Sequence, residues 1–156
     1  MESVRISRVA GLRPRYRARL RAAQRDVAQV WMLCRDIHLS ARQNHTSWPT
    51  QYAFQRATKV RCALHSQTTM QAIWRTFLGA IDTTHQRRRA TSKIHPSYKD
   101  KRHHYPLLCW PAQAVSRRRG GAMLSVERGQ PSLVLPIGLP AQSGACNGVW
   151  QDGSEL

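Results

Sequence analysis

The spacing of hydrophobic residues predicts helices in the first half of the chain. Between about Arg15 and Gln43, apolar side chains recur at three- and four-residue intervals, which is typical of an amphipathic helix with one buried face. The stripe consists of Leu20, Val27, Val30, Trp31, Cys34, Ile37, His38 and Ala41. The opposite face carries Arg21, Arg25, Arg35 and Arg42, which can face water or phosphate.

Two further helices are expected. The segment Ser47-Trp48-Pro49-Thr50 predicts a second start, with proline in the first turn, and this helix should reach about Leu64. Its expected buried residues are Tyr52 or Ala53, Ala57, and Val60 or Leu64. A third helix is expected from about Gln67 to Gln86, with Ser66 as N-cap. Its apolar stripe is Met70, Ile73, Trp74, Phe77, Leu78 and Ile81, so three helices should bury one another.

The pattern becomes β-like after Tyr105. Leu107–Trp110 predicts a strand ended by proline, residues 112–116 a turn of helix, and residues 117–121 a basic turn. Residues 122–127 and 131–135 predict a hairpin. Residues 149–156 predict a strand, an Asp-Gly turn and the first residues of a partner strand. Because a hairpin arm without its partner is unstable, we expect the sequence to be a fragment.

These elements predict an α+β fold. The expected organisation is a helical, recognition-like region over residues 1–86, a basic linker over 87–105, and a truncated β region over 106–156. The short antiparallel strands of that last region should form an incomplete barrel.

The excess of basic residues is the strongest indication of a binding partner in this sequence. The 156 residues include 25 Lys and Arg against 8 Asp and Glu, a formal net charge of +17. Such an excess repels itself in a compact fold unless a polyanion neutralises it, and arginine suits phosphate contacts and stacking on bases. Nucleic acid, RNA or DNA, is therefore the expected partner. An anionic membrane surface is the competing one, although no apolar run approaches the ~20 residues of a membrane span.

The segment from Arg87 to Tyr105 mixes basic side chains with tyrosines, as binding to phosphates and bases requires. A flexible connection would have the same composition. The expected nucleic-acid contacts are Arg87, Arg88, Arg89, Lys99, Lys101, Arg102, Arg117, Arg118 and Arg119, with Tyr98 and Tyr105 stacking on bases. The four cysteines lack CxxC or paired Cys/His spacing, so no metal site and no cofactor are expected.

Three motifs, in this order, resemble the N-terminal half of TnpB, the OrfB-type protein of insertion sequences, which is related to type V CRISPR effectors. They are Leu64–Gln71, which reads Leu-x-Ser-Gln-x-x-x-Gln, then His95–Lys99 within a basic region, and then Leu133–Gly138. The resemblance covers about residues 20–140. It implies a helical recognition lobe and a wedge-like β-barrel that grip a guide RNA and its DNA target.

The family's nuclease is a RuvC-like domain whose three carboxylates hold two metal ions. Beyond Glu127 this chain offers Asp152 and Glu155 alone, so no catalytic residue is carried over and no enzyme activity of its own is expected. The resemblance implies a cytoplasmic, nucleoid-associated, nucleic-acid-binding fragment of a transposon-encoded RNA-guided nuclease or transposase. The alternatives are a small basic helical DNA-binding regulator, with Gln67 and Gln71 reading bases, and a non-functional remnant.

Overall fold

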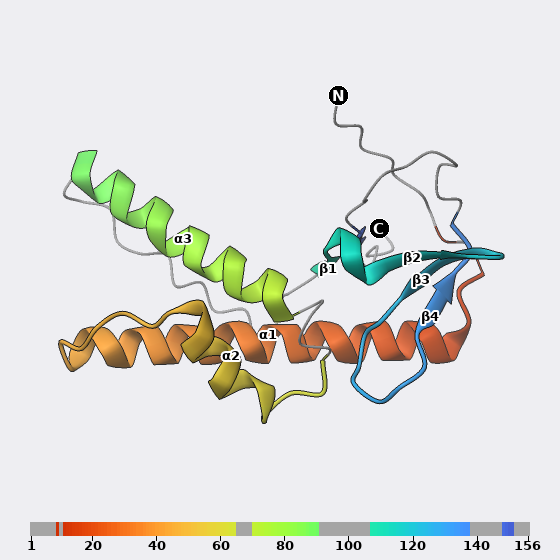
Figure 1. Ribbon diagram of the computed structural model, residues 1–156, viewed down its shortest axis with the longest axis horizontal. Helices are drawn as coiled ribbons and strands as arrows, with labels where there is room; N and C mark the ends of the chain where they lie inside the picture. Colours follow the sequence, from red (N-terminus) through yellow and green to blue (C-terminus); the bar gives the residue numbers. More distant parts are fainter. Residues whose placement is uncertain (1–8, 10, 65–69, 91–106, 138–147, 152–156) are drawn as a thin grey trace.

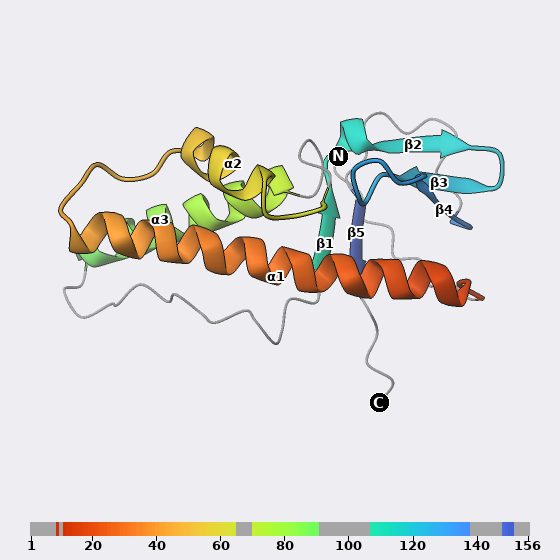
Figure 2. The same cartoon turned by 90° about the horizontal axis from the view of Figure 1, so that it is seen from below.

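One long helix forms the spine of the molecule. The computed structural model describes residues 9, 11–64, 70–90, 107–137 and 148–151. Helix α1 (Pro14–Gln43) has 30 residues and is therefore about 45 Å long at 1.5 Å per residue. Helices α2 (Gln51–Lys59) and α3 (Gln71–Ala90) lie along its C-terminal half, and the strands lie along its N-terminal half (Figures 1 and 2).

The predicted first helix is confirmed, and both of its ends have a physical cause. Pro14 occupies the first turn, where its missing N–H costs nothing. At the other end the backbone N–H of Thr46 donates to the carbonyl of Ala41 at 3.0 Å, and that of His45 donates to Arg42 at 3.3 Å. These two bonds form a Schellman turn, with His45 at a φ of 52° in the position that glycine usually takes.

The apolar stripe of α1 lies in the core as predicted. Leu20, Val27, Val30, Trp31, Cys34 and His38 are buried, and so are Ala23, Ala28 and Met32. The Phe77 ring of α3 meets Trp31 edge-on at a centroid distance of 5.1 Å and Phe54 of α2 at 5.6 Å. Phe77 therefore joins all three helices.

The second helix differs from its prediction in both start and buried face. Pro49 precedes the helix, and Thr50 is the N-cap, its hydroxyl accepting from the Ala53 N–H at 3.4 Å. The buried residues are Phe54 and Thr58, which were not expected, whereas Tyr52 and Val60 are 68% and 88% exposed. Of the expected alternatives, Ala53 and Ala57 are half-buried, and Leu64 is buried but lies beyond the helix. A nine-residue helix fits several phases, and the contact of Phe54 with Phe77 selects one.

The apolar stripe predicted for the third helix is confirmed. Met70, Ile73, Trp74, Phe77 and Ile81 are buried, and Leu78 is half-buried. The helix continues to Ala90, so Arg87, Arg88 and Arg89 lie on its last turn. Ser66, the expected N-cap, lies outside the described residues.

The strands form two small antiparallel sheets. Strands β2 (Val115–Arg118), β3 (Gly121–Leu124) and β4 (Leu133–Leu135) make a three-stranded sheet in that order. The β3–β4 hairpin and the short helical turn Ala112–Ala114 were predicted. Strand β2 was not, because its Arg117 and Arg118 read as part of a turn. In the described residues this sheet is open, with β2 and β4 at its edges, so the predicted helices followed by short antiparallel strands are confirmed but the strands do not close into a barrel.

The last described strand has a partner. Strand β5 (Gly148–Gln151) pairs antiparallel with β1 (Leu107–Trp110), with Leu108 opposite Trp150. The predicted strand is confirmed but it is not unpartnered, and the predicted Asp-Gly turn with its second arm lies outside the described residues. The partner is a strand about forty residues earlier in the chain, which a search for local turns does not reveal. Because β5 is paired with β1, it gives no support to the expectation that the sequence is a fragment.

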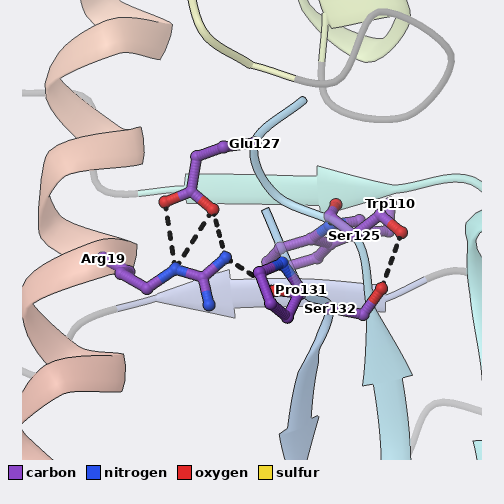
Figure 3. Close-up of polar contacts among 6 residues, drawn as sticks. All are labelled: Arg19, Trp110, Ser125, Glu127, Pro131 and Ser132. Carbon is purple, nitrogen blue, oxygen red and sulfur yellow. Dashed lines mark hydrogen bonds and ion pairs between the residues drawn. The ribbon is translucent and has the colours of Figure 1, made fainter. Parts of the chain in front are cut away.

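A polar clamp fastens the sheet to the spine (Figure 3). Arg19 of α1 makes a bidentate ion pair with Glu127, in the loop between β3 and β4, and also donates to the Pro131 carbonyl at 2.8 Å. On the same loop, the Arg128 side chain donates to the carbonyls of Lys59 and Cys62. These bonds fix the loop against α1 and against the chain that follows α2.

Candidate nucleic-acid interface

The predicted basic residues of the sheet surround one exposed turn. Arg117 and Arg118 end strand β2, and Arg119 begins the two-residue turn that leads to β3. All three side chains are exposed. The turn projects at the end of the molecule where α1 begins (Figures 1 and 2). A basic edge strand also discourages pairing with other chains, so these arginines suit both solubility and phosphate binding.

The predicted basic residues of the third helix lie at the opposite end. Arg87, Arg88 and Arg89 occupy the last turn of α3, at the end of the molecule where α1 ends (Figures 1 and 2). Arg87 is exposed. The fold thus places the two predicted sets towards opposite ends of α1, which is about 45 Å long. The remaining predicted contacts, Tyr98, Lys99, Lys101, Arg102 and Tyr105, lie outside the described residues.

A third basic group was predicted only in part. Arg21 and Arg25 were expected on the polar face of α1, and the structure adds Arg17: the three are exposed and follow one another at four-residue intervals. This spacing places them in one row on the helix surface, each about 6 Å further along the axis. Like charges at this spacing destabilise a helix, so a bound anion would relieve them. The same periodicity that predicts the apolar stripe extends this Arg17–Arg25 row back to Arg17, one turn before Arg21.

The row starts beside another basic feature. The guanidinium groups of Arg13 and Arg15 lie over the Tyr16 ring, 6.0 and 5.2 Å from its centroid. With the β2–β3 turn they give the start of α1 a dense set of exposed arginines. We call this region the sheet end. It consists of Arg13, Arg15, the Arg17–Arg25 row and Arg117–Arg119.

The other end of α1 carries aromatic rings as well as charge. Trp48, in the connection between α1 and α2, lies against His85 of α3 at a centroid distance of 4.2 Å and against His38 of α1 at 5.1 Å. Burial lowers the pKa of His38, and the positive charge of Arg42 and the neighbouring His85 lower it further. At neutral pH His38 is therefore an uncharged ring of the core.

Burial also affects three cysteines. Burial raises the pKa of Cys34 to about 12 and also raises that of Cys62 and Cys109, so these thiols stay protonated. Within the described ranges, no three His, Cys, Asp or Glu side chains gather in a way that could hold a metal ion. Across the same residues, no helix has the length and apolar character needed to cross a bilayer.

No family model, no curated protein and no solved structure matches this chain. The resemblance to TnpB therefore depends on its motifs. Of these, Leu133–Leu135 forms strand β4, whereas His95–Lys99 and most of Leu64–Gln71 lie outside the described residues.

Proposed function

We propose that the protein binds nucleic acid, mainly through arginine contacts to phosphates. The observation that carries this proposal is the sheet end, where the exposed Arg17–Arg25 row and the basic β2–β3 turn lie at one end of the molecule. Arginine at such positions offers forked hydrogen bonds to phosphate oxygens, and counterion release supplies the free energy.

The length of the spine sets the scale of a full contact. Duplex DNA rises 3.4 Å per base pair, so the ~45 Å of α1 corresponds to about 13 base pairs. A shorter duplex can satisfy one end of the protein at a time. Affinity should therefore rise with duplex length up to about 13 base pairs, faster than the number of overlapping sites would explain.

The motif order supports a more specific version of the proposal. In it, the chain is the guide-RNA- and DNA-binding part of a TnpB-like, transposon-encoded system, works in the cytoplasm with the nucleoid, and does not cut DNA by itself. Its test is a comparison of structured guide-like RNA with duplex DNA of equal length. Preference for the RNA supports this version, and equal affinity leaves only general nucleic-acid binding.

Salt dependence tests the general proposal. If about six phosphates are neutralised, log affinity should fall with log salt at a slope of about −5 on duplex DNA. Replacing Arg17, Arg21 and Arg25 together with glutamine should make the slope shallower by about 2 to 3. Fluorescence anisotropy with a labelled duplex at several salt concentrations measures both.

A charge-matched variant separates a local interface from general attraction. Arg56, Lys59 and Arg61 are also three exposed basic residues, at the end of α2 and just beyond it. Their replacement by glutamine should change the slope by less than 1, on the rule of about 0.9 per phosphate contact. Equal effects of the two triple variants would refute the sheet-end interface, and a salt-independent or absent signal would refute nucleic-acid binding. Circular dichroism of each variant checks that it is folded.

A further inference from the structure

Trp48 differs from the other tryptophans whose surroundings the structure describes. Its side chain is 45% exposed, whereas Trp31, Trp74 and Trp110 are 6% exposed or less. An indole used only for packing would be buried in the same way, because indole is among the largest apolar surfaces that a chain can remove from water. Its exposure therefore needs a separate explanation.

The exposed indole of Trp48 packs against two histidine rings. His38 meets it at 71° and a centroid distance of 5.1 Å, and His85 lies tilted against it at 4.2 Å. His38 is itself buried and contacts the central Phe77 ring at 6.2 Å. On either side of Trp48 the backbone is fixed by the Schellman turn at His45 and by the Thr50 cap. The indole is thus held in place by the core rather than left on a free loop.

Both helices that contact this ring carry an exposed arginine near the contacting histidine. Arg42 is exposed in the last turn of α1 and lies close enough to His38 to lower its pKa. Arg87 is exposed two residues beyond His85 on α3. Asp82, one turn before His85, is an exposed acidic residue on the same helix. Arg42 and Arg87 thus bring positive charge to the two helices whose histidines contact the indole.

We propose that Trp48 is a stacking platform for an unpaired base of a single-stranded nucleic acid, with Arg42 and Arg87 contacting the flanking phosphates. This inference rests on the proposed nucleic-acid binding and adds the class of ligand that this end selects. A single strand offers free base faces, whereas the bases of a duplex already stack on one another. Exposed aromatics within a basic groove bind single strands in this way, with little sequence preference.

The test compares two probes on the full chain. The probes are an oligothymidylate of about twelve nucleotides and a duplex of about 13 base pairs. Trp48→Ala should weaken binding of the single strand about tenfold, as the loss of one stacked base predicts, and should change duplex binding less than twofold. Trp48→Phe, which keeps an aromatic face, should recover most of the single-strand affinity. Val60→Ala, at an 88% exposed apolar position, is the control and should leave both affinities unchanged.

Fluorescence gives a readout that a purely structural role would not change. Acrylamide should quench a component of the tryptophan emission that is absent from Trp48→Phe, and oligothymidylate should protect that component. If wild-type protein binds the oligonucleotides but Trp48→Ala weakens both equally or neither, the stacking platform is refuted and the proposed function stands. If wild-type protein binds neither probe in dilute buffer, the proposed function itself fails. A thermal melt of each variant identifies any that does not fold.

Discussion

The clamp between Arg19 and Glu127 should be the polar contact on which the position of the sheet depends. Arg19 Nε lies 3.2 Å from both Glu127 oxygens, and Nη2 lies 2.5 Å from Oε2 and 2.8 Å from the Pro131 carbonyl oxygen. The two side chains are 25% and 16% exposed. The perturbation to test is Glu127→Ala, which leaves the guanidinium in a mostly dry position without its anion.

The expected size of the effect follows from this burial. Exposed ion pairs contribute about 0–1 kcal/mol, whereas breaking a buried pair costs about 3–5 kcal/mol. A pair that is four-fifths buried falls between these limits, and we expect Glu127→Ala to lower the free energy of unfolding by about 2 kcal/mol. For a chain of this size that corresponds to a fall in Tm of about 4–8 °C.

The chain provides its own control. Arg35 and Asp36 form an ion pair at 3.2 Å in which Asp36 is 60% exposed. Asp36→Ala should therefore cost less than about 0.5 kcal/mol in the same urea titration followed by circular dichroism. A double-mutant cycle with Arg19→Ala and Glu127→Ala should show coupling of at least about 1 kcal/mol. Additive single effects, or equal costs for Glu127→Ala and Asp36→Ala, would refute the reasoning.

Three other substitutions test the backbone and the core. Gly121→Ala should lower the free energy of unfolding by at least about 2 kcal/mol, because Gly121 has a φ of 153° and an added Cβ would overlap the Leu135 carbonyl. Gly79→Ala, where nothing lies within 4 Å of the added Cβ, should instead stabilise α3 by about 0.5–1 kcal/mol. Equal urea midpoints for the two variants would contradict this. His45→Gly should raise the Tm, since it relieves a left-handed residue at a net gain of about 0.5 kcal/mol; a lower Tm would count against the Schellman turn. The folded-state pKa of His38 is lowered from 6.5, so its contribution to stability is fully present above pH 6.5 and is lost as the pH falls towards the folded value. Melts between pH 7.5 and about 5.5 should show this loss in wild type and a smaller one in His38→Phe.

Much of the helical part could be predicted because its signals are local. In α1 and α3 a long apolar stripe fixes which face is buried, and Trp31, Cys34, Trp74 and Phe77 are buried accordingly. In α2 the sequence allows several phases, and only the contact between Phe54 and Phe77 decides among them. The pairing of β1 with β5 is harder still, because no turn joins the two strands.

The candidate interface shows the same division between local and distant information. That Arg117 and Arg118 are exposed could be expected from their charge alone. Their distance from Arg87 could not, because it depends on the direction in which α3 packs along α1 (Figure 1). Trp48 was interpreted as part of a helix start, since nothing nearby in the sequence indicates that His85 would lie against it. The Arg17–Arg25 row, by contrast, was available from periodicity.

The carboxylates of this fold are too few and too engaged to balance its arginines. Glu127 is used by Arg19 in the clamp, and Asp36 lies against Arg35. Burial raises the pKa of Asp26 and the nearby Glu127 raises it further, although Arg25 opposes them. The ionised form of this carboxylate is therefore destabilised in the folded protein. With 25 basic against 8 acidic residues, side chains of this protein cannot neutralise both ends of α1. A polyanion can do so at both ends at once, because its charges are continuous over the ~45 Å that separate them. For the proposed function, the distribution of charge along α1, more than its total, is therefore the argument for a long nucleic acid over small anions.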